Sequence, residues 1–260
     1  MRTLNSLLTV FCCSLAFNAV AETDGLSLLK KTLSELQGSL PISAIYQRAY
    51  KEISDADDKN DRKETNGLMR VLVTKDEQGL QVIYPKILLA TIEQETGAKA
   101  IDEDAETPTL NAVNGINAAG LHNQLSSANK MLREINKATF IDEQAYSYND
   151  IPTRLLRFNL PLEAVINDAK TRDYVSTFEG VYKIVIDQDG VPLETQIEFK
   201  GKGRAFLVLS VKVDNSEVSK FEVVDNRLVR VHHEYSNAIY STFGDNMSSG
   251  VNILTILENQ

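Results

Sequence analysis

Apolar residues recur along the chain with two different periods, and the change of period divides it into a helical and a strand-rich part. Near the start, leucines are spaced by three or four positions, which places them on one face of a helix that ends at Gly38. These leucines are Leu26, Leu29, Leu33 and Leu36. From Phe140 onward the spacing changes toward two, the period of a strand with one buried face.

Shorter apolar runs predict a hairpin between these two parts. The runs 68–74 and 80–84 flank a polar connection of hairpin length that contains Gly79, which predicts a β-hairpin. The segment 42–46 looks extended. Pro85 then opens a short helix, because a proline in the first turn removes no hydrogen bond that the helix needs.

The longest periodic segment predicts one central helix. Apolar residues recur every three or four positions from Ala118 to Ala138, which corresponds to a helix of about 20 residues and about 30 Å. Its apolar face is rich in alanine, so a sheet or another helix can approach it closely.

Five turn signals divide the strand-rich part into short runs, and connections this short join antiparallel neighbours. The signals are 149–152, 187–190, 200–203, 214–215 and 225–226. We therefore expect an α+β fold with an N-terminal helix and β-hairpin, one long central helix, and a C-terminal antiparallel β-meander of six to seven strands packed against helix. A short helix around 162–169 interrupts the meander.

The first 21 residues predict export. Arg2 gives a positive start, an uncharged apolar run follows, and Ala19-Val20-Ala21 is the small-x-small pattern that a signal peptidase accepts, so we expect cleavage after Ala21. An uncleaved anchor and a lipid-modified cysteine are the alternatives. Cleavage leaves residues 22–260 as a single α+β domain, and the acidic segment 96–108 is the candidate for a sub-boundary within it.

Composition and charge narrow the function classes. The chain has 27 basic and 36 acidic side chains and a formal charge of -9, so we expect no nucleic-acid partner, which would need clustered Lys and Arg. Both cysteines, Cys12 and Cys13, lie in the predicted signal. An exported chain without thiols is typical of a bacterial envelope. No later segment is apolar enough to span a membrane, which predicts a periplasmic or secreted location.

The histidines give one candidate metal pair. His232 and His233 are adjacent on a predicted strand and point to opposite faces, so they cannot easily bind one metal ion. The strand instead pairs His232 with Glu234 and His233 with Tyr235. His232 with Glu234 is the candidate metal or acid–base pair, and a solvated pair is the alternative. Two aspartate-rich loops lack the ligand spacing of a calcium loop, and we expect no cofactor.

One serine motif raises the hypothesis of an enzyme. Ser127 and Lys130 match S-x-x-K, in which a lysine deprotonates a serine one helical turn away, and Ser147 begins an S-x-N as in serine β-lactamases and penicillin-binding proteins. The third element, K-T-G, is absent, and residues 27–30 match S-x-x-K as well. Solvated helix residues are therefore the competing interpretation.

Because no catalytic set is complete, the leading hypothesis is an exported, non-enzymatic binding or carrier protein of the bacterial envelope. A helix over a curved sheet can enclose a cavity for a lipid or other amphiphile. The order helix, strands, helix, strands resembles that of periplasmic lipoprotein carriers, a resemblance of layout. The residues expected either to face such a cavity or to pack as plain core are Leu121, Leu125, Leu132, Ile135, Phe206 and Val208.

Two functions of other classes stay open. One is an envelope hydrolase that uses a serine or a pair of carboxylates. The other is a scaffold that contacts envelope proteins through exposed strand edges. The sequence alone sets neither the ligand nor the oligomeric state.

Overall fold

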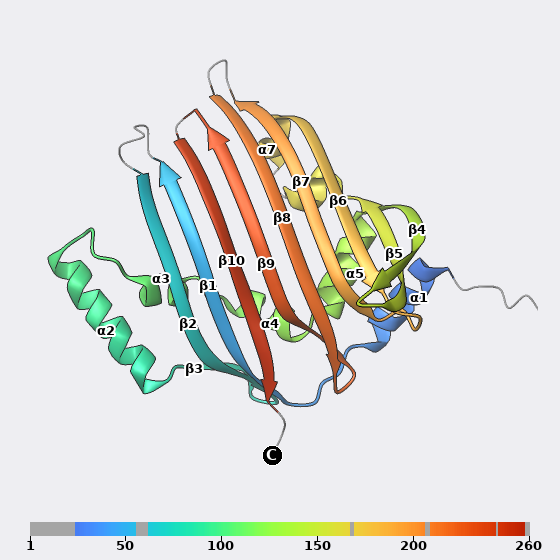
Figure 1. The fold of residues 1–260 in the computed structure, drawn as a ribbon, viewed down its shortest axis with the longest axis horizontal. Coiled ribbons are helices and arrows are strands. Elements are labelled where there is room, and N and C mark those ends of the chain that lie inside the picture. Colours follow the sequence, from blue (N-terminus) through green and yellow to red (C-terminus); the bar gives the residue numbers. More distant parts are fainter. Residues whose placement is uncertain (1–23, 56–61, 167–168, 206–208, 243, 258–260) are drawn as a thin grey trace, which may run out of the picture.

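A computed structural model describes residues 24–55, 62–166, 169–205, 209–242 and 244–257 (Figure 1). The predicted signal, with Cys12 and Cys13, lies outside these residues. Among the described residues, no helix is both long and apolar enough to cross a bilayer.

The strands of the described chain form one antiparallel sheet in the order β3-β2-β1-β10-β9-β8-β7-β6-β5-β4. Strand β1 pairs with β10 from Ser43–Leu257 to Ser54–Asn246, so the N-terminal hairpin extends the C-terminal meander. The bounds are β1 Ile42–Asp55, β2 Arg62–Asp76, β3 Gly79–Ile83, β4 Thr139–Tyr148, β5 Ile151–Asn159, β6 Val175–Ile186, β7 Pro192–Ala205, β8 Leu209–Val224, β9 Arg227–Ser241 and β10 Gly244–Leu257.

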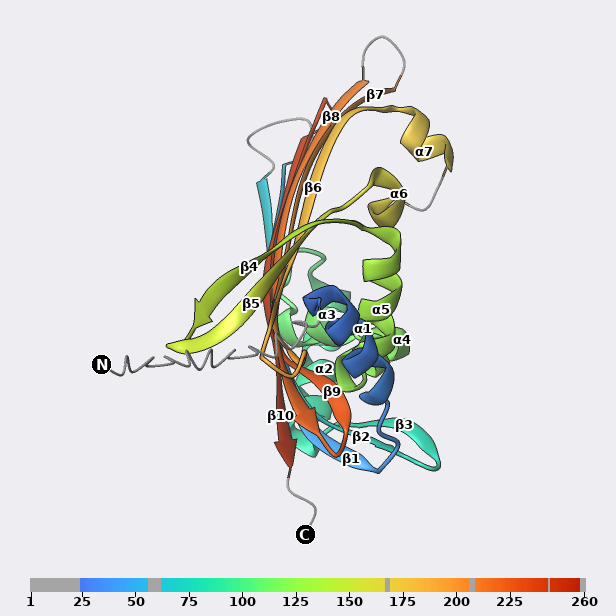
Figure 2. The same ribbon diagram turned by 90° about the vertical axis from the view of Figure 1, so that its right-hand side faces the viewer.

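The helices lie on one face of this sheet, which we call the helix-side face, and leave the opposite, outer face bare (Figure 2). Their bounds are α1 Gly25–Glu35, α2 Lys86–Ile101, α3 Pro108–Asn114, α4 Ala118–Leu125, α5 Ala128–Lys137, α6 Leu162–Val165 and α7 Ala169–Asp173. Strands β4 and β5 form a hairpin that projects past the outer face (Figure 2).

The core consists of two apolar clusters between helices and sheet. The first packs α1 and α5 against β5 and β6, with Leu29, Leu33 and Phe158 almost fully buried. The second packs α3 and α4 against β1 and β2, with Val73 and Leu125 fully buried. Covering the strands in this way removes apolar surface from water, which is the main stabilising term of such a fold.

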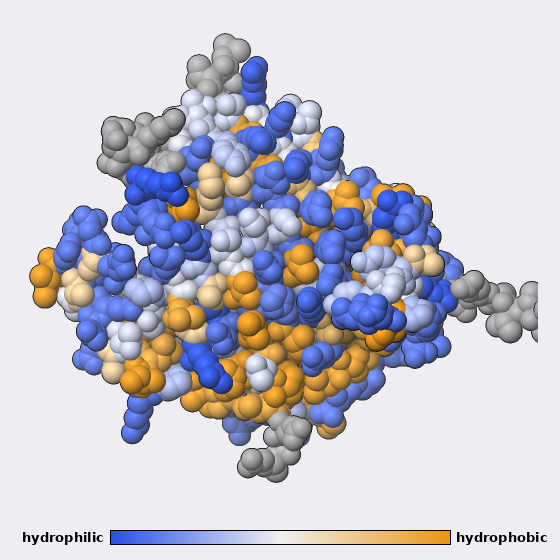
Figure 3. Space-filling view, viewed as in Figure 1, coloured by the Kyte–Doolittle hydropathy of each residue, from blue (hydrophilic) through white to orange (hydrophobic). Residues whose placement is uncertain are grey.

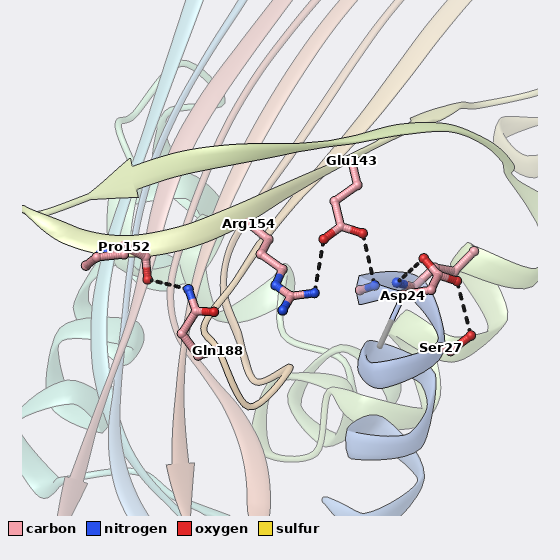
Figure 4. Close-up of polar contacts among 8 residues, drawn as sticks. Asp24, Ser27, Glu143, Pro152, Arg154 and Gln188 are labelled. Atoms are coloured by element: carbon pink, nitrogen blue, oxygen red, sulfur yellow. Dashed lines mark hydrogen bonds and ion pairs between the residues drawn. The ribbon is translucent and has the colours of Figure 1, made fainter. Parts of the chain in front are cut away.

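Helix α1 is fixed to the β4–β5 hairpin at its first turn (Figure 4). The Asp24 side chain caps the helix by accepting from the Leu26 amide and the Ser27 hydroxyl. The Gly25 amide donates to Glu143 Oε2 at 2.9 Å, and Arg154 donates to the other carboxylate oxygen at 3.2 Å. A carboxylate at a helix N-terminus satisfies free amides and complements the helix dipole.

The predicted fold class is wrong in its strand number and in its central helix. The sheet has ten strands, because the segments at 42–83 join it as three strands and those after Phe140 supply seven. The predicted helix from Ala118 to Ala138 is divided into α4 and α5 at Ser126 and Ser127. Ser126 leaves the helical conformation, with φ -152° and ψ 80°. The Ser127 amide donates to Leu228 O of β9 at 2.8 Å, so a bond to the sheet replaces a helical one.

Two predicted turns are also wrong. Residues 200–203 lie inside β7 and 214–215 inside β8, where Lys200 pairs with Asp214. Gly203 allows close packing, because a Cβ there would lie 2.7 Å from Tyr174 O. The turns at 149–150 and 225–226 do have the positive φ angles that Asn and Asp tolerate. The predicted helix around 162–169 is present as α6, with α7 following it.

Candidate ligand pocket

Helix α5 positions a row of charged side chains over the helix-side face. Its apolar face is held in the first core cluster by Ala128, Met131 and Ile135. The opposite face carries Lys130, Arg133, Glu134 and Lys137, and these residues form one rim of a pocket of about 450 Å³. We call this cavity the α5 pocket.

Apolar groups make up the wall opposite that rim. Leu160, Ala164 and Val165 come from the end of β5 and from α6, and Ile197 and Phe199 come from β7. Tyr182 of β6 forms part of the floor and is 1% exposed. The pocket therefore has a cationic rim and an apolar wall, within the size of about 300–1,000 Å³ that is typical of ligand sites.

A narrow extension adjoins the α5 pocket. It shares Lys130, Glu134, Tyr182 and Glu217 with the larger cavity, is also lined by Arg230, and holds about 20 Å³. That volume suits about one water molecule and is too small for a phosphate or carboxylate group. A ligand of any size must therefore occupy the outer cavity.

Two cations on the rim are available for a ligand. Lys130 forms an ion pair with Glu134 one turn away. Arg133 and Lys137 are exposed, and neither forms an ion pair with another residue of the described chain. Their spacing of four places both on the same side of α5. Such a rim concentrates positive charge locally in a chain of net charge -9.

A partly buried polar network on β1, β8, β9 and β10 extends from the pocket at Glu217. Tyr46 Oη donates to Asn252 Oδ1 at 3.0 Å, and the Asn252 amide lies 3.2 Å from His233 Nδ1. His233 Nε2 lies 3.4 Å from Glu217 Oε2. Since Asn252 has only N–H groups left for the ring, Nδ1 accepts and the proton sits on Nε2, which assigns a neutral imidazole.

The pKa directions of these groups agree with that assignment. Burial lowers the pKa of His233, and Arg230 adds to this effect. The hydrogen bond from His233 lowers the pKa of the Glu217 carboxyl. Burial also lowers the pKa of the Arg230 guanidinium, whose Nε is buried without a hydrogen-bond partner among the described residues. The network thus holds a neutral imidazole against the Glu217 carboxylate, which itself lines the α5 pocket.

The serine candidates lie in two different parts of the fold. Ser127 is 4% exposed at the start of α5, and its hydroxyl donates to Asn123 O at 2.7 Å. Lys130 lies in the same pocket but pairs with Glu134. Ser147 is exposed near the tip of the β4–β5 hairpin. The structure therefore brings Ser127 and Lys130 to one pocket and leaves Ser147 apart from them.

The apolar candidates belong to the two core clusters. Leu121 and Leu125 of α4 pack in the second cluster, whereas Leu132 and Ile135 of α5 belong to the first. None of the four lines the α5 pocket or its extension. Phe206 and Val208 lie outside the described residues.

The histidine pairing predicted from the strand period is present. His232 and Glu234 lie on the outer face of β9, with His232 Nε2 3.8 Å from Glu234 Oε2. His233 stacks on Tyr235 on the helix-side face, with ring centroids 5.7 Å apart. Within the described residues, no group of three or more His, Cys, Asp or Glu side chains could hold a metal ion.

Sequence reasoning missed the pocket residues that matter most here. Arg133 and Lys137 were visible as cations four positions apart on a helix with an apolar opposite face, a pattern that also describes any solvated helix. Val165, Ile197 and Phe199 come from α6 and β7, and only the folded sheet brings them opposite α5.

Comparisons with known proteins add little to this picture. No family model and no curated protein matches the chain. A search of solved structures finds MucB in complex with MucA(peri), at 9% sequence identity and a TM-score of 0.25, covering 91% of this chain and 100% of that chain. A likeness at this level carries no functional conclusion for this chain.

Proposed function

We propose that the protein is an exported, non-catalytic binding protein that holds an anionic amphiphile in the α5 pocket. Export rests on the signal predicted at residues 1–21. The observation that carries the binding proposal is the division of the pocket into a rim and an apolar wall opposite. On the rim, Arg133 and Lys137 form no ion pair with any residue that the structure describes. Such a pocket suits a ligand with an anionic head and a hydrocarbon tail.

Each half of the pocket contributes a different interaction. Burying a hydrocarbon chain against Val165, Ile197 and Phe199 removes apolar area from water at about 25 cal/mol per Å². Exposed ion pairs add up to about 1 kcal/mol each and weaken with salt. The tail therefore supplies most of the affinity, and Arg133 and Lys137 select for the charge of the head.

The test is a titration of the purified chain with a fluorescent long-chain fatty acid and with the uncharged alcohol of the same length. The wild type should bind the acid more tightly than the alcohol, and added salt should reduce the difference. In the double variant Arg133→Gln/Lys137→Gln, affinity for the acid should fall about tenfold, the sum of two surface contacts, while affinity for the alcohol stays the same.

A matched variant controls for the loss of positive charge. Lys31→Gln/Lys86→Gln removes two exposed lysines on α1 and α2, outside the α5 pocket. It should bind the acid like the wild type. Equal binding of acid and alcohol by the wild type, or equal loss in both double variants, would contradict the proposal.

A further inference from the structure

Strand β2 has a long edge that pairs with no other described strand, at the other end of the sheet from the α5 pocket. Strand β2 covers Arg62–Asp76, but β3 pairs only with Leu72–Asp76. Residues 62–71 therefore pair with β1 on one side and with no described strand on the other. An edge of this kind presents unpaired N–H and C=O groups that can accept another strand.

Helix α2 stands beside this edge (Figure 1) and reaches the second core cluster only through partly buried side chains such as Leu88. None of its residues is buried, and Ile87 at its N-terminal end is 79% exposed. The helix is fixed near its middle, where the Glu95 carboxylate accepts from the amides of Thr109 and Leu110 of α3 at 3.1 and 2.8 Å. The edge of β2 thus lies beside a helix whose N-terminal end is apolar.

Two pockets occupy that space and follow β2 along its length, and together we call them the β2 groove. The lower pocket, about 560 Å³, is lined by β2 residues 68–72 and by Ile87 and Leu88 of α2. The upper pocket, about 250 Å³, is lined by β2 residues 63–66 and by residues 103–108 after α2. The groove spans nearly the whole unpaired length of the strand.

The two ends of the β2 groove differ in chemistry. The lower end is mainly apolar, although Arg70 also lines it, and it includes Leu68, which is 57% exposed. An apolar area also lies low on the outer face (Figure 3). The upper end carries four carboxylates and two lysines. They are Glu64, Glu103, Asp104, Glu106, Lys63 and Lys99. Glu64 is ion-paired with Lys51 at 2.7 Å. An occupant that follows β2 therefore meets mainly apolar side chains at one end, and the carboxylates of Glu103, Asp104 and Glu106 beside two lysines at the other.

The geometry points to an extended segment of another protein that adds a strand to β2 in this groove, with apolar residues at one end and Lys or Arg at the other. Backbone hydrogen bonds to residues 62–71 supply the pairing, and alternate side chains reach the groove. A second copy of this chain fits less well, because pairing two β2 edges would bring α2 of each copy into the same space (Figure 1). This inference does not depend on the α5 pocket.

The test uses a short fluorescent peptide of alternating valine and threonine with two lysines at one end. The full chain should bind it, and amide hydrogen exchange should slow in residues 62–71. The same peptide N-methylated at alternate backbone nitrogens should bind at least tenfold more weakly, because it lacks the donors for strand pairing. Unchanged affinity after N-methylation, or protection elsewhere, would overturn the inference.

A charge swap tests the orientation. In Glu103→Lys/Glu106→Lys, both exposed positions, affinity for the lysine peptide should fall about tenfold, and a peptide with glutamates in place of the lysines should gain by a similar factor. The pocket variant Arg133→Gln/Lys137→Gln should bind the lysine peptide like the wild type, which separates this site from the proposed function. Unchanged affinities of the charge-swapped variant for the two peptides would overturn the inference. So would a dimer of the chain that excludes the peptide.

Discussion

His233 Nε2 lies 3.4 Å from the Glu217 carboxylate on the helix-side face, where β8 and β9 pair, and the ring is neutral in this arrangement. Burial places the folded-state pKa of His233 below its ordinary value of 6.5. Between that lower pKa and 6.5 the unfolded chain binds more protons than the folded one, so the free energy of unfolding falls as the pH falls. Glu217, whose pKa is lowered from 4.5, loses its contribution at still lower pH.

His233→Gln should therefore make the free energy of unfolding less dependent on pH below about 6.5, measured by urea denaturation across a pH series. Part of the dependence should remain, because burial also lowers the pKa of His122. The neighbouring His232→Gln, on the outer face, is the control and should keep the wild-type slope. Identical slopes for the two variants would mean that His233 is not a buried neutral histidine.

Arg227 links the start of β9 to the segment that follows α1 through side-chain hydrogen bonds. It is 2% exposed, and its guanidinium donates to Gly38 O at 2.8 Å and to Leu40 O. Arg227→Met keeps the apolar stem and leaves both carbonyls without a donor, which should cost about 2–4 kcal/mol of unfolding free energy. Thermal unfolding measures this loss, and Arg227→Lys should recover part of it. A change below about 0.5 kcal/mol would contradict the role.

Ser127 is expected to have a local structural role. Its hydroxyl donates to Asn123 O, and removing that bond in Ser127→Ala should cost about 1 kcal/mol of stability. Binding of a fatty acid should be unchanged. Labelling of the wild type by a fluorophosphonate, and its loss in Ser127→Ala, would instead favour the serine hydrolase left open by the sequence.

Period and turn chemistry predicted those elements whose local signals agree with the tertiary structure. The hairpin of β2 and β3 and the turn at Asp225 and Asn226 follow from short-range rules about turn residues and alternation. The predicted fold class was wrong where long-range contacts determine the secondary structure. Residues 47–55 are largely polar, so nothing local indicates that β1 continues through them, yet β10 and β2 supply partners on both sides.

The predicted central helix was also wrong because of a long-range contact. Here the contact interrupts an element that the local pattern predicts to be continuous. Apolar spacing through Ser126 and Ser127 is helical throughout, but the bond from the Ser127 amide to Leu228 O belongs to a strand a hundred residues further along the chain. The candidate site could not be predicted from the sequence for a related reason. Its cations and its apolar wall come from α5, α6 and β7, and periodicity within one element cannot bring them together.

The proposed binding function depends on the sign of charge that the pocket favours, and Val165 provides a direct way to change it. Val165 is half-buried in the apolar wall, opposite the cations of α5. Val165→Glu and Val165→Lys remove the same apolar side chain and add opposite charges. The glutamate should repel an anionic head group, whereas the lysine should attract it.

Native mass spectrometry measures the bound amphiphile most directly. The wild type and these two variants are each recovered from an envelope fraction and compared. We expect the wild type to carry an anionic amphiphile, Val165→Lys to retain most of it, and Val165→Glu to lose it. Recovery of empty wild-type protein in repeated preparations, or equal loading of the two variants, would contradict the account.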